Sequence, residues 1–213
     1  AANHVSVERD LADLKHGINV NVVWTTINGK RDKELLPIRV SLIRELNNYR
    51  IFLIGKDDQT KFDQVQSIND LRKLRAGLGS NWPDVEVMRN NGLPVVTSPT
   101  HQSLFKMLAV KRFDYFPRGL YEIWNEEELH KDLGLRVEQK LMIYYQAPFY
   151  YFVNKKDVAL AERIEAGLKL AMADGSFDTL MQSVPSYKRG LEEQRTAHRK
   201  LFVLDALYDK YEE

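Results

Sequence analysis

The sequence contains no cysteine, so disulfides, thiolate metal sites and cysteine nucleophiles are all excluded. No apolar run approaches the ~18 residues of a membrane-spanning helix, and no charged-then-apolar leader opens the chain. An excess of one charge is lacking too, because 31 Lys and Arg stand against 30 Asp and Glu, for a formal net charge of +1. Since binding to a phosphate backbone needs a basic excess or patch, the composition gives no support for nucleic-acid binding.

The motifs of common enzyme and metal sites are missing as well. None of the five histidines shows a metal-ligand spacing such as H-E-x-x-H, so we expect no metal and no cofactor. There is no G-x-S-x-G, Walker loop or G-x-G-x-x-G, and residues 77–82 (GLGSNW) hold a single G-x-G. We therefore expect no catalytic residue. Glu122 or His101 as a general acid is the alternative, although nothing in their spacing requires it.

What the sequence does contain is the composition of a packed globular protein, with 44% hydrophobic and 29% charged residues. Apolar residues recur at helical spacing from Val7 onward, and Gly17 follows them, which predicts an amphipathic helix that ends at this glycine. Ser67 is placed to cap a short helix, and Gly175 to interrupt a long C-terminal one. Predicted strands cover 18–24, 49–55, 74–79, 93–98, 112–116, 140–145, 149–154 and 200–204, with residues 25–31 as a loop.

Strands that alternate with helices of 10–15 residues are typical of βαβ units and a mostly parallel sheet. The block from about 55 to 147 has enough such units to form one lobe, and the strands at 49–55 and 149–154 bracket it. We therefore predict a two-lobed α/β protein with two hinge strands. One lobe combines 1–49 with 154–213, and the other is 50–153.

Four stretches, in this order, resemble the extracellular solute-binding proteins of family 3, which have the type II periplasmic-binding-protein fold. They are LADLKHGINVNVVWTTINGKR (11–31), LRAGLGSNW (74–82), LFKMLAVKRFDYFPRG (104–119) and LAERIEAGLKLAMADGSFDTLMQ (160–182). The resemblance implies capture of a small carboxylate-bearing, amino-acid-like solute between the lobes, in the periplasm, for delivery to the permease subunits of an ABC-type transporter. Members begin with a strand, a helix and a strand, and a βαβ unit takes ~30 residues. We therefore expect that unit to be absent before Val7 and the first lobe to be incomplete.

The resemblance assigns Arg31 to the solute's carboxylate, because a planar guanidinium can form two parallel charge-assisted hydrogen bonds with it. Thr26 adds a hydroxyl from the same segment. The alternative is that Arg31 is an exposed side chain in a polar loop. Trp24 and Trp82 are expected to floor the cleft, since small-molecule pockets are lined by aromatic and apolar side chains. Core packing is the alternative for both.

The second lobe contributes Gly79, Ser80 and Asn81, because a turn into a helix presents backbone N–H groups to an anionic group. An ordinary capped helix is the alternative there. Arg118 stands at a strand end, where ligands of open α/β sheets bind, and where family members usually carry an aspartate for the ligand's ammonium. An arginine suits a second acidic group, whereas a salt bridge to Glu122 or Glu126 is the alternative.

Two other functions remain open from the sequence. The same fold serves as a ligand-sensing or protein-interaction module, and some members became dehydratases of cyclic carboxylic acids. Ligand-independent binding to another protein favours the first of these, and turnover of a cyclic acid favours the second.

Overall fold

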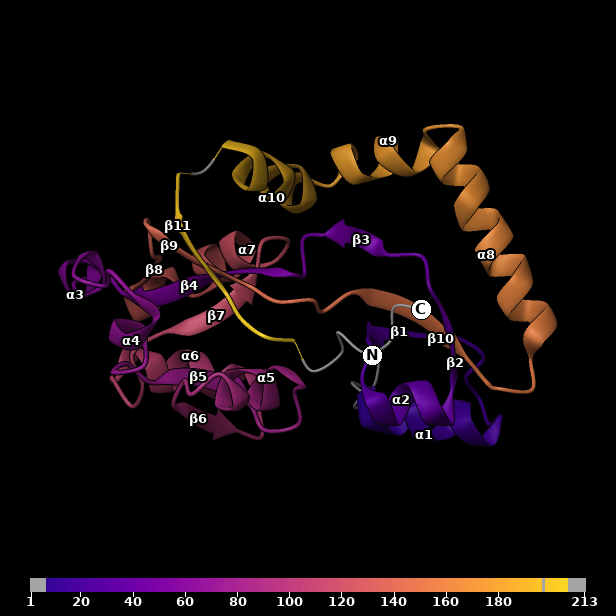
Figure 1. The fold of residues 1–213 in the computed structure, drawn as a ribbon, viewed down its shortest axis with the longest axis horizontal. Coiled ribbons are helices and arrows are strands. Elements are labelled where there is room, and N and C mark those ends of the chain that lie inside the picture. Colours follow the sequence, from indigo (N-terminus) through magenta and orange to yellow (C-terminus); the bar gives the residue numbers. More distant parts are fainter. Residues whose placement is uncertain (1–6, 197, 207–213) are drawn as a thin grey trace. The chain divides into compact units, whose positions relative to one another are not determined.

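The computed structural model describes residues 7–196 and 198–206, and it divides the chain into two compact units (Figure 1). Unit 1 comprises 1–44 and 147–183, and unit 2 comprises 45–146 and 184–213. The chain therefore passes between units at three places: between Arg44 and Glu45, between Gln146 and Ala147, and between Ser183 and Val184.

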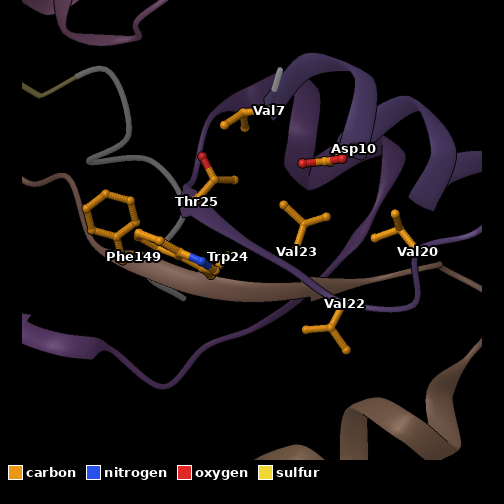
Figure 2. Close-up of a pocket in the computed structure, with 8 residues that line it drawn as sticks. All are labelled: Val7, Asp10, Val20, Val22, Val23, Trp24, Thr25 and Phe149. Atoms are coloured by element: carbon orange, nitrogen blue, oxygen red, sulfur yellow. The ribbon is translucent and has the colours of Figure 1, made fainter. Parts of the chain in front are cut away.

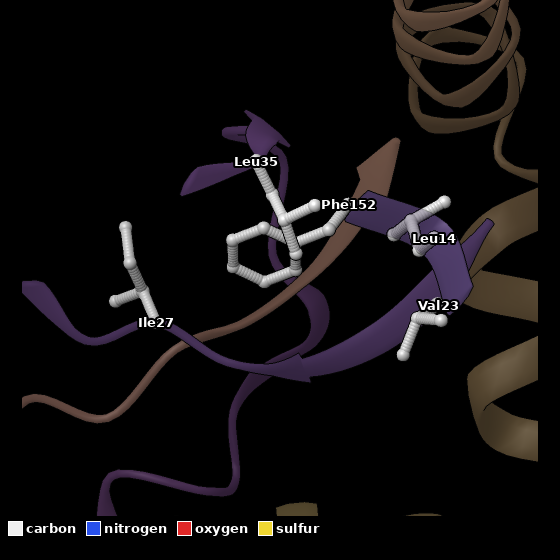
Figure 3. Packing of buried hydrophobic residues seen from close by; sticks show 5 residues of the cluster. All are labelled: Leu14, Val23, Ile27, Leu35 and Phe152. Carbon is white, nitrogen blue, oxygen red and sulfur yellow. The ribbon is translucent and has the colours of Figure 1, made fainter. Parts of the chain in front are cut away.

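Unit 1 is a small antiparallel sheet with helices. Its strands β1 (Val23–Thr26), β10 (Phe149–Val153) and β2 (Leu36–Ile38) lie in the order β1-β10-β2. One apolar cluster, shown in Figure 3, joins α1 (Val7–His16) to this sheet and consists of Leu14, Val23, Ile27, Leu35 and Phe152. A second cluster packs the sheet against α8 (Val158–Ala173). The remaining elements are α2 (Gly29–Glu34), β3 (Leu42–Glu45) and α9 (Ser176–Ser183).

Two of the unit's glycines end helices as the sequence predicts. Gly17 follows α1 with φ +68°, and Gly175 separates α8 from α9 with φ +80°. Glycine adopts this left-handed conformation without the steric cost that a Cβ brings. The helix that begins near Val7 and the break at Gly175 are therefore both confirmed.

Unit 2 is built on a sheet in the order β11-β9-β4-β7, and β8 also pairs with β4. Its central strand β4 (Tyr49–Gly55) consists of buried residues apart from its ends. A separate parallel pair joins β5 (Ala76–Gly79) to β6 (Val95–Ser98). The other strands are β7 (Phe116–Gly119), β8 (Leu135–Val137), β9 (Leu141–Tyr144) and β11 (Lys200–Val203).

The helices of unit 2 are mostly short. Ser67 caps α4 (Ile68–Leu71) in a capping box with Asp70, which confirms its predicted role. The others are α3 (Gln59–Asp63), α5 (Asp84–Asn90), α6 (His101–Ala109), α7 (Ile123–Leu129), the 3-10 turn Lys131–Leu133 and α10 (Pro185–Thr196). Among the described residues, no helix is both long and apolar enough to cross a membrane.

The expected α/β, two-unit architecture is present, but the sheets are not mostly parallel. β4 pairs antiparallel with β7, β8 and β9, and both pairings of β10 are antiparallel. The strand pairs β5–β6 and β9–β11 are parallel, as is an isolated bridge between Ala76 and Tyr115. The sequence correctly placed the strands at 49–55, 74–79, 93–98 and 149–154. It missed that the two bracketing strands, 49–55 and 149–154, run against their neighbours.

The C-terminal segment also differs from the predicted division, which placed 154–213 in the first lobe. Residues 184–213 group with unit 2, where β11 pairs in parallel with β9. A Cβ built on Gly190 of α10 would lie 2.6 Å from the main-chain oxygen of Leu120. Glycine at this position therefore lets the helix approach the backbone of unit 2 closely.

Candidate functional site

Arg31 lies in a helix, not in the expected loop. The side chain of Asn28 caps α2 by accepting a hydrogen bond from the Arg31 backbone N–H at 2.7 Å. The Arg31 side chain reaches back to the end of β1, where its Nη1 donates to the Thr26 main-chain oxygen at 2.7 Å. The same nitrogen lies 3.1 Å from Thr25 Oγ1 and 3.2 Å from Thr26 Oγ1.

These contacts bring together two of the predicted residues, Arg31 and Thr26, and add Thr25, which the sequence analysis did not single out. Both threonines are buried, and Arg31 is partly buried. A guanidinium held at one nitrogen by three oxygens has a defined orientation, which is what planar recognition of a carboxylate requires.

Trp24 lies beside this group on β1 and is 58% exposed, so it is not a core residue. Its ring lies 5.3 Å, centroid to centroid, from that of Phe149. Figure 2 shows both rings at one end of a cavity of about 500 Å³ within unit 1. The lining is mainly apolar, with Asp10 and Thr25 as its polar members. Of the predicted site residues, Trp24 is the one found in this lining, which is formed by Val7, Asp10, Val20, Val22, Val23, Trp24, Thr25 and Phe149.

In unit 2, Gly79, Ser80, Asn81 and Trp82 form one tight turn between β5 and α5. The Trp82 N–H donates to the Gly79 oxygen at 3.0 Å, and the Ser80 N–H donates to the Ser98 oxygen at 2.9 Å. A Cβ on Gly79 would lie 2.5 Å from the Trp82 indole, so glycine is needed for the ring to fold over the turn. Ser80 and Asn81 are exposed.

Arg118, at the end of β7, is buried in a network of carboxylates. Its Nε and Nη2 donate to Glu126 at 2.6 and 2.7 Å, and Nη2 lies 2.8 Å from Glu122. The guanidinium also lies over the Trp82 ring, 5.0 Å from its centroid. Both carboxylates that formed the alternative interpretation of Arg118 are therefore its partners, and the network holds the ring of Trp82.

The two carboxylates differ in their pKa values. Burial raises the pKa of Glu122 above the usual range, although the charge of Arg118 opposes this shift. Burial acts in the same direction on Glu126, but the charge of Arg118 and the hydrogen bonds from His101 and Arg118 outweigh it, so the pKa of Glu126 is lowered. His101 Nε2 lies 3.2 Å from Glu126. The pKa values of the two carboxylates are therefore shifted in opposite directions, although both groups contact Arg118.

No protein-family model matches the sequence, and no curated protein is significantly similar to it. Solved structures do match. The probable amino-acid ABC transporter extracellular-binding protein ytmK of Bacillus subtilis is 16% identical with a TM-score of 0.63, over 85% of this chain and 78% of that chain. An ancestral arginine-binding protein bound to glutamine is 17% identical with a TM-score of 0.62, over 84% and 76% of the two chains.

A third match is the ancestral amino acid-binding protein AncCDT-1, described as a precursor of cyclohexadienyl dehydratase. It is 16% identical with a TM-score of 0.60, over 82% of this chain and 72% of that chain. The chain has the two-lobed type II periplasmic-binding-protein fold. This confirms the fold that the four sequence stretches predicted.

Within this periplasmic-binding-protein fold, three residues of unit 2 escaped the sequence analysis. Arg50 Nε and Nη2 lie 3.3 and 3.1 Å from Asp84 Oδ1, and the Tyr145 hydroxyl donates to the same oxygen. One available signal was the lone arginine in the apolar strand YRIFLIG, since a buried cation needs a partner. Its partners lie 34 and 95 positions away in the sequence, and no local pattern identifies them. Among the described residues, no group of three or more His, Asp and Glu side chains could hold a metal ion.

Proposed function

We propose that the chain is a solute-binding protein that captures a small, carboxylate-bearing, amino-acid-like solute between its two units. The arrangement around Arg31 carries this proposal. The Arg31 guanidinium is oriented by Thr25 and Thr26 at the end of β1, and such a group binds a carboxylate with strong, directional hydrogen bonds. Thr26 supplies a second polar contact in the proposal.

The turn of unit 2 supplies the complementary contacts. Ser80 and Asn81 are exposed at the turn, and their side chains suit a second polar group of the solute. Gly79 lets the turn form. Arg118, buried and paired with Glu122 and Glu126, acts on the solute indirectly, by holding the Trp82 ring in place. Trp24 and Trp82 provide apolar surfaces for the solute's carbon skeleton.

The proposal extends to location and partners. Amino-acid ABC transporter binding proteins are among the chains with this fold, which supports delivery of the solute to membrane permease subunits from the periplasm. We propose that the chain acts by binding and release without chemistry. The dehydratase alternative is kept as an outcome of the test, since one similar binding protein is a precursor of such an enzyme.

A thermal-shift screen with L-glutamine, L-arginine, L-glutamate and succinate tests the proposal. A solute at 100 times its Kd stabilises the native state by about 2.7 kcal/mol, so a binder should raise the melting temperature by several degrees. If none of the four compounds raises it, solute binding of this chemical class is contradicted. Turnover of a prephenate-like acid would instead favour the enzyme.

A further inference from the structure

Three segments of unit 2 meet at a single carboxylate oxygen. Asp84 Oδ1 accepts hydrogen bonds from Arg50 Nε at 3.3 Å, from Arg50 Nη2 at 3.1 Å and from the Tyr145 hydroxyl. Arg50 belongs to β4, Tyr145 directly follows β9, and Asp84 is the first residue of α5. The Arg50 guanidinium also lies over the Tyr145 ring, 5.1 Å from its centroid, so the three side chains form one packed unit.

This group is buried. The side chains of Arg50 and Asp84 are 5% and 14% exposed, and Tyr145 is 1% exposed. Burial by itself would raise the pKa of Asp84, but the charge of Arg50 and the hydrogen bonds from Tyr145 and Arg50 lower it. The carboxylate is therefore held in its ionised form, and its Oδ1 is tied to both residues, which anchors the start of α5.

Asp84 follows the Gly79–Trp82 turn, with only Pro83 between it and Trp82. Two attachments therefore hold the C-terminal end of the turn. Trp82 packs over the Arg118 guanidinium and stacks on Phe116, with ring centroids 6.0 Å apart. Two residues further on, Asp84 is tied to Arg50 of β4 and to Tyr145, which follows β9.

We propose that Arg50 and Tyr145 are positioning residues for solute binding, which hold the Gly79–Trp82 turn in its binding conformation through Asp84 without touching the solute. A preorganised site loses less conformational entropy when it binds, so fixing the turn raises affinity. This inference rests on the proposed function for its effect on affinity. Its effect on the turn itself can be measured with no solute present.

The most specific variant is Tyr145→Phe, because it removes one hydroxyl and leaves the Arg50–Asp84 ion pair and the packing of the ring in place. The chain provides a matched control in Tyr115→Phe. Tyr115 is fully buried in the same unit, and its hydroxyl has no hydrogen-bond partner among the described residues. Both variants delete a buried hydroxyl, but only Tyr145→Phe removes a hydrogen bond to Asp84. Arg50→Lys serves as a second variant that keeps the charge and loses the forked contact.

Hydrogen exchange of the backbone amides of Ser80, Trp82 and Val85, measured without solute, reports on the turn directly, because each of them donates a hydrogen bond there. We expect exchange about tenfold faster in Tyr145→Phe and in Arg50→Lys, and unchanged in Tyr115→Phe, with amides of β5 and β7 protected as in the wild type. That figure corresponds to the net contribution of one hydrogen bond to a charged group, about 1.5 kcal/mol. Unchanged exchange in both turn variants, or loss of protection spread evenly over unit 2, would overturn the proposal.

Affinity is measured by calorimetry with whichever of the four screening compounds binds the wild type. We expect Tyr145→Phe to weaken binding about tenfold and Tyr115→Phe to leave it unchanged. Equal affinity of Tyr145→Phe and wild type would overturn the positioning role while leaving the proposed function intact. Failure of all four compounds with the wild type contradicts the proposed function, and hydrogen exchange then still decides whether these residues hold the turn.

Discussion

The side chain of Asn91 forms a two-point hydrogen-bonded pair with the backbone of Asp205. Its Nδ2 donates to the Asp205 oxygen at 2.9 Å, and its Oδ1 accepts from the Asp205 N–H at 2.9 Å. Nδ2 also lies 2.9 Å from the Val87 oxygen of α5. One amide thus fastens the segment after β11 to the end of α5, 114 positions earlier in the sequence.

Replacing Asn91 by alanine should release this segment. The variant loses three hydrogen bonds, two with Asp205 and one with Val87. Each contributes about 0.5–1.5 kcal/mol. Because the two bonds with Asp205 are exposed, we expect the free energy of unfolding to fall by about 1–2 kcal/mol. Hydrogen exchange at Asp205 should become faster, while exchange in β4 stays unchanged. The exposed neighbour Asn90, replaced by alanine, is the control. Equal behaviour of the two variants would contradict the assignment of the pair.

Two glycines provide a matched test of close packing. A Cβ on Gly79 would overlap the Trp82 ring at 2.5 Å, whereas a Cβ on Gly167 in α8 meets nothing within 4 Å. Gly79→Ala should therefore destabilise by about 1–3 kcal/mol. Gly167→Ala should stabilise by about 0.5–1 kcal/mol, because alanine is the better helix former. Urea unfolding measures both, and a stabilising Gly79→Ala would show that the turn is loosely packed.

The Arg118–Glu126 pair is predicted to hold unit 2 together. Arg118→Met leaves two largely buried carboxylates without their cation, and breaking a buried pair in this way costs about 3–5 kcal/mol. Adding Glu126→Gln to Arg118→Met should recover part of the loss, since it removes one of the unpaired charges. A loss below about 1 kcal/mol for Arg118→Met would contradict the stabilising role of the pair.

Asp84 predicts a specific dependence of stability on pH. Its pKa is lowered in the folded chain, relative to about 3.9 in an unfolded chain. Its stabilising contribution is therefore complete above about pH 5 and is lost as the pH falls through 3.9 toward the folded-state value. Asp84→Asn should be less stable than the wild type at pH 7, and the difference should narrow in acid. Denaturation curves between pH 3 and pH 7 check this, and a constant difference would contradict the role of the charge.

The sequence predicted features that depend on neighbouring residues. The Ser67 cap, the helix that ends at Gly17 and the break at Gly175 follow from local backbone preferences, and the structure has all three. The turn after β5 and the strand 49–55 were also placed correctly. The loop predicted at 25–31 is wrong at its end, because Asn28 caps α2, which begins at Gly29. Asparagine is favoured both in loops and as a helix cap, since its side-chain oxygen can accept a hydrogen bond from a nearby backbone N–H in either setting.

Features that depend on distant residues could not be predicted. Three such features join segments 30 or more positions apart in the sequence. They are the antiparallel pairings of β4, the placement of 184–213 in unit 2, and the convergence of Arg50 and Tyr145 on Asp84. Both partners of Arg118, Glu122 and Glu126, lie nearby in the sequence, four and eight positions later. The sequence could not decide between a salt bridge and a solute, because that choice depends on burial.

The most direct test of the central claim is a calorimetric titration of Arg31→Ala beside Lys33→Ala, with the screening compound that binds the wild type. Lys33 lies two residues away on α2 and is exposed, so it controls for charge and for the helix. We predict that Lys33→Ala keeps the wild-type Kd and that Arg31→Ala weakens binding at least a hundredfold, since hydrogen bonds to charged groups contribute about 1.5–3 kcal/mol each. Full affinity in Arg31→Ala would contradict the assignment of this arginine to the solute's carboxylate.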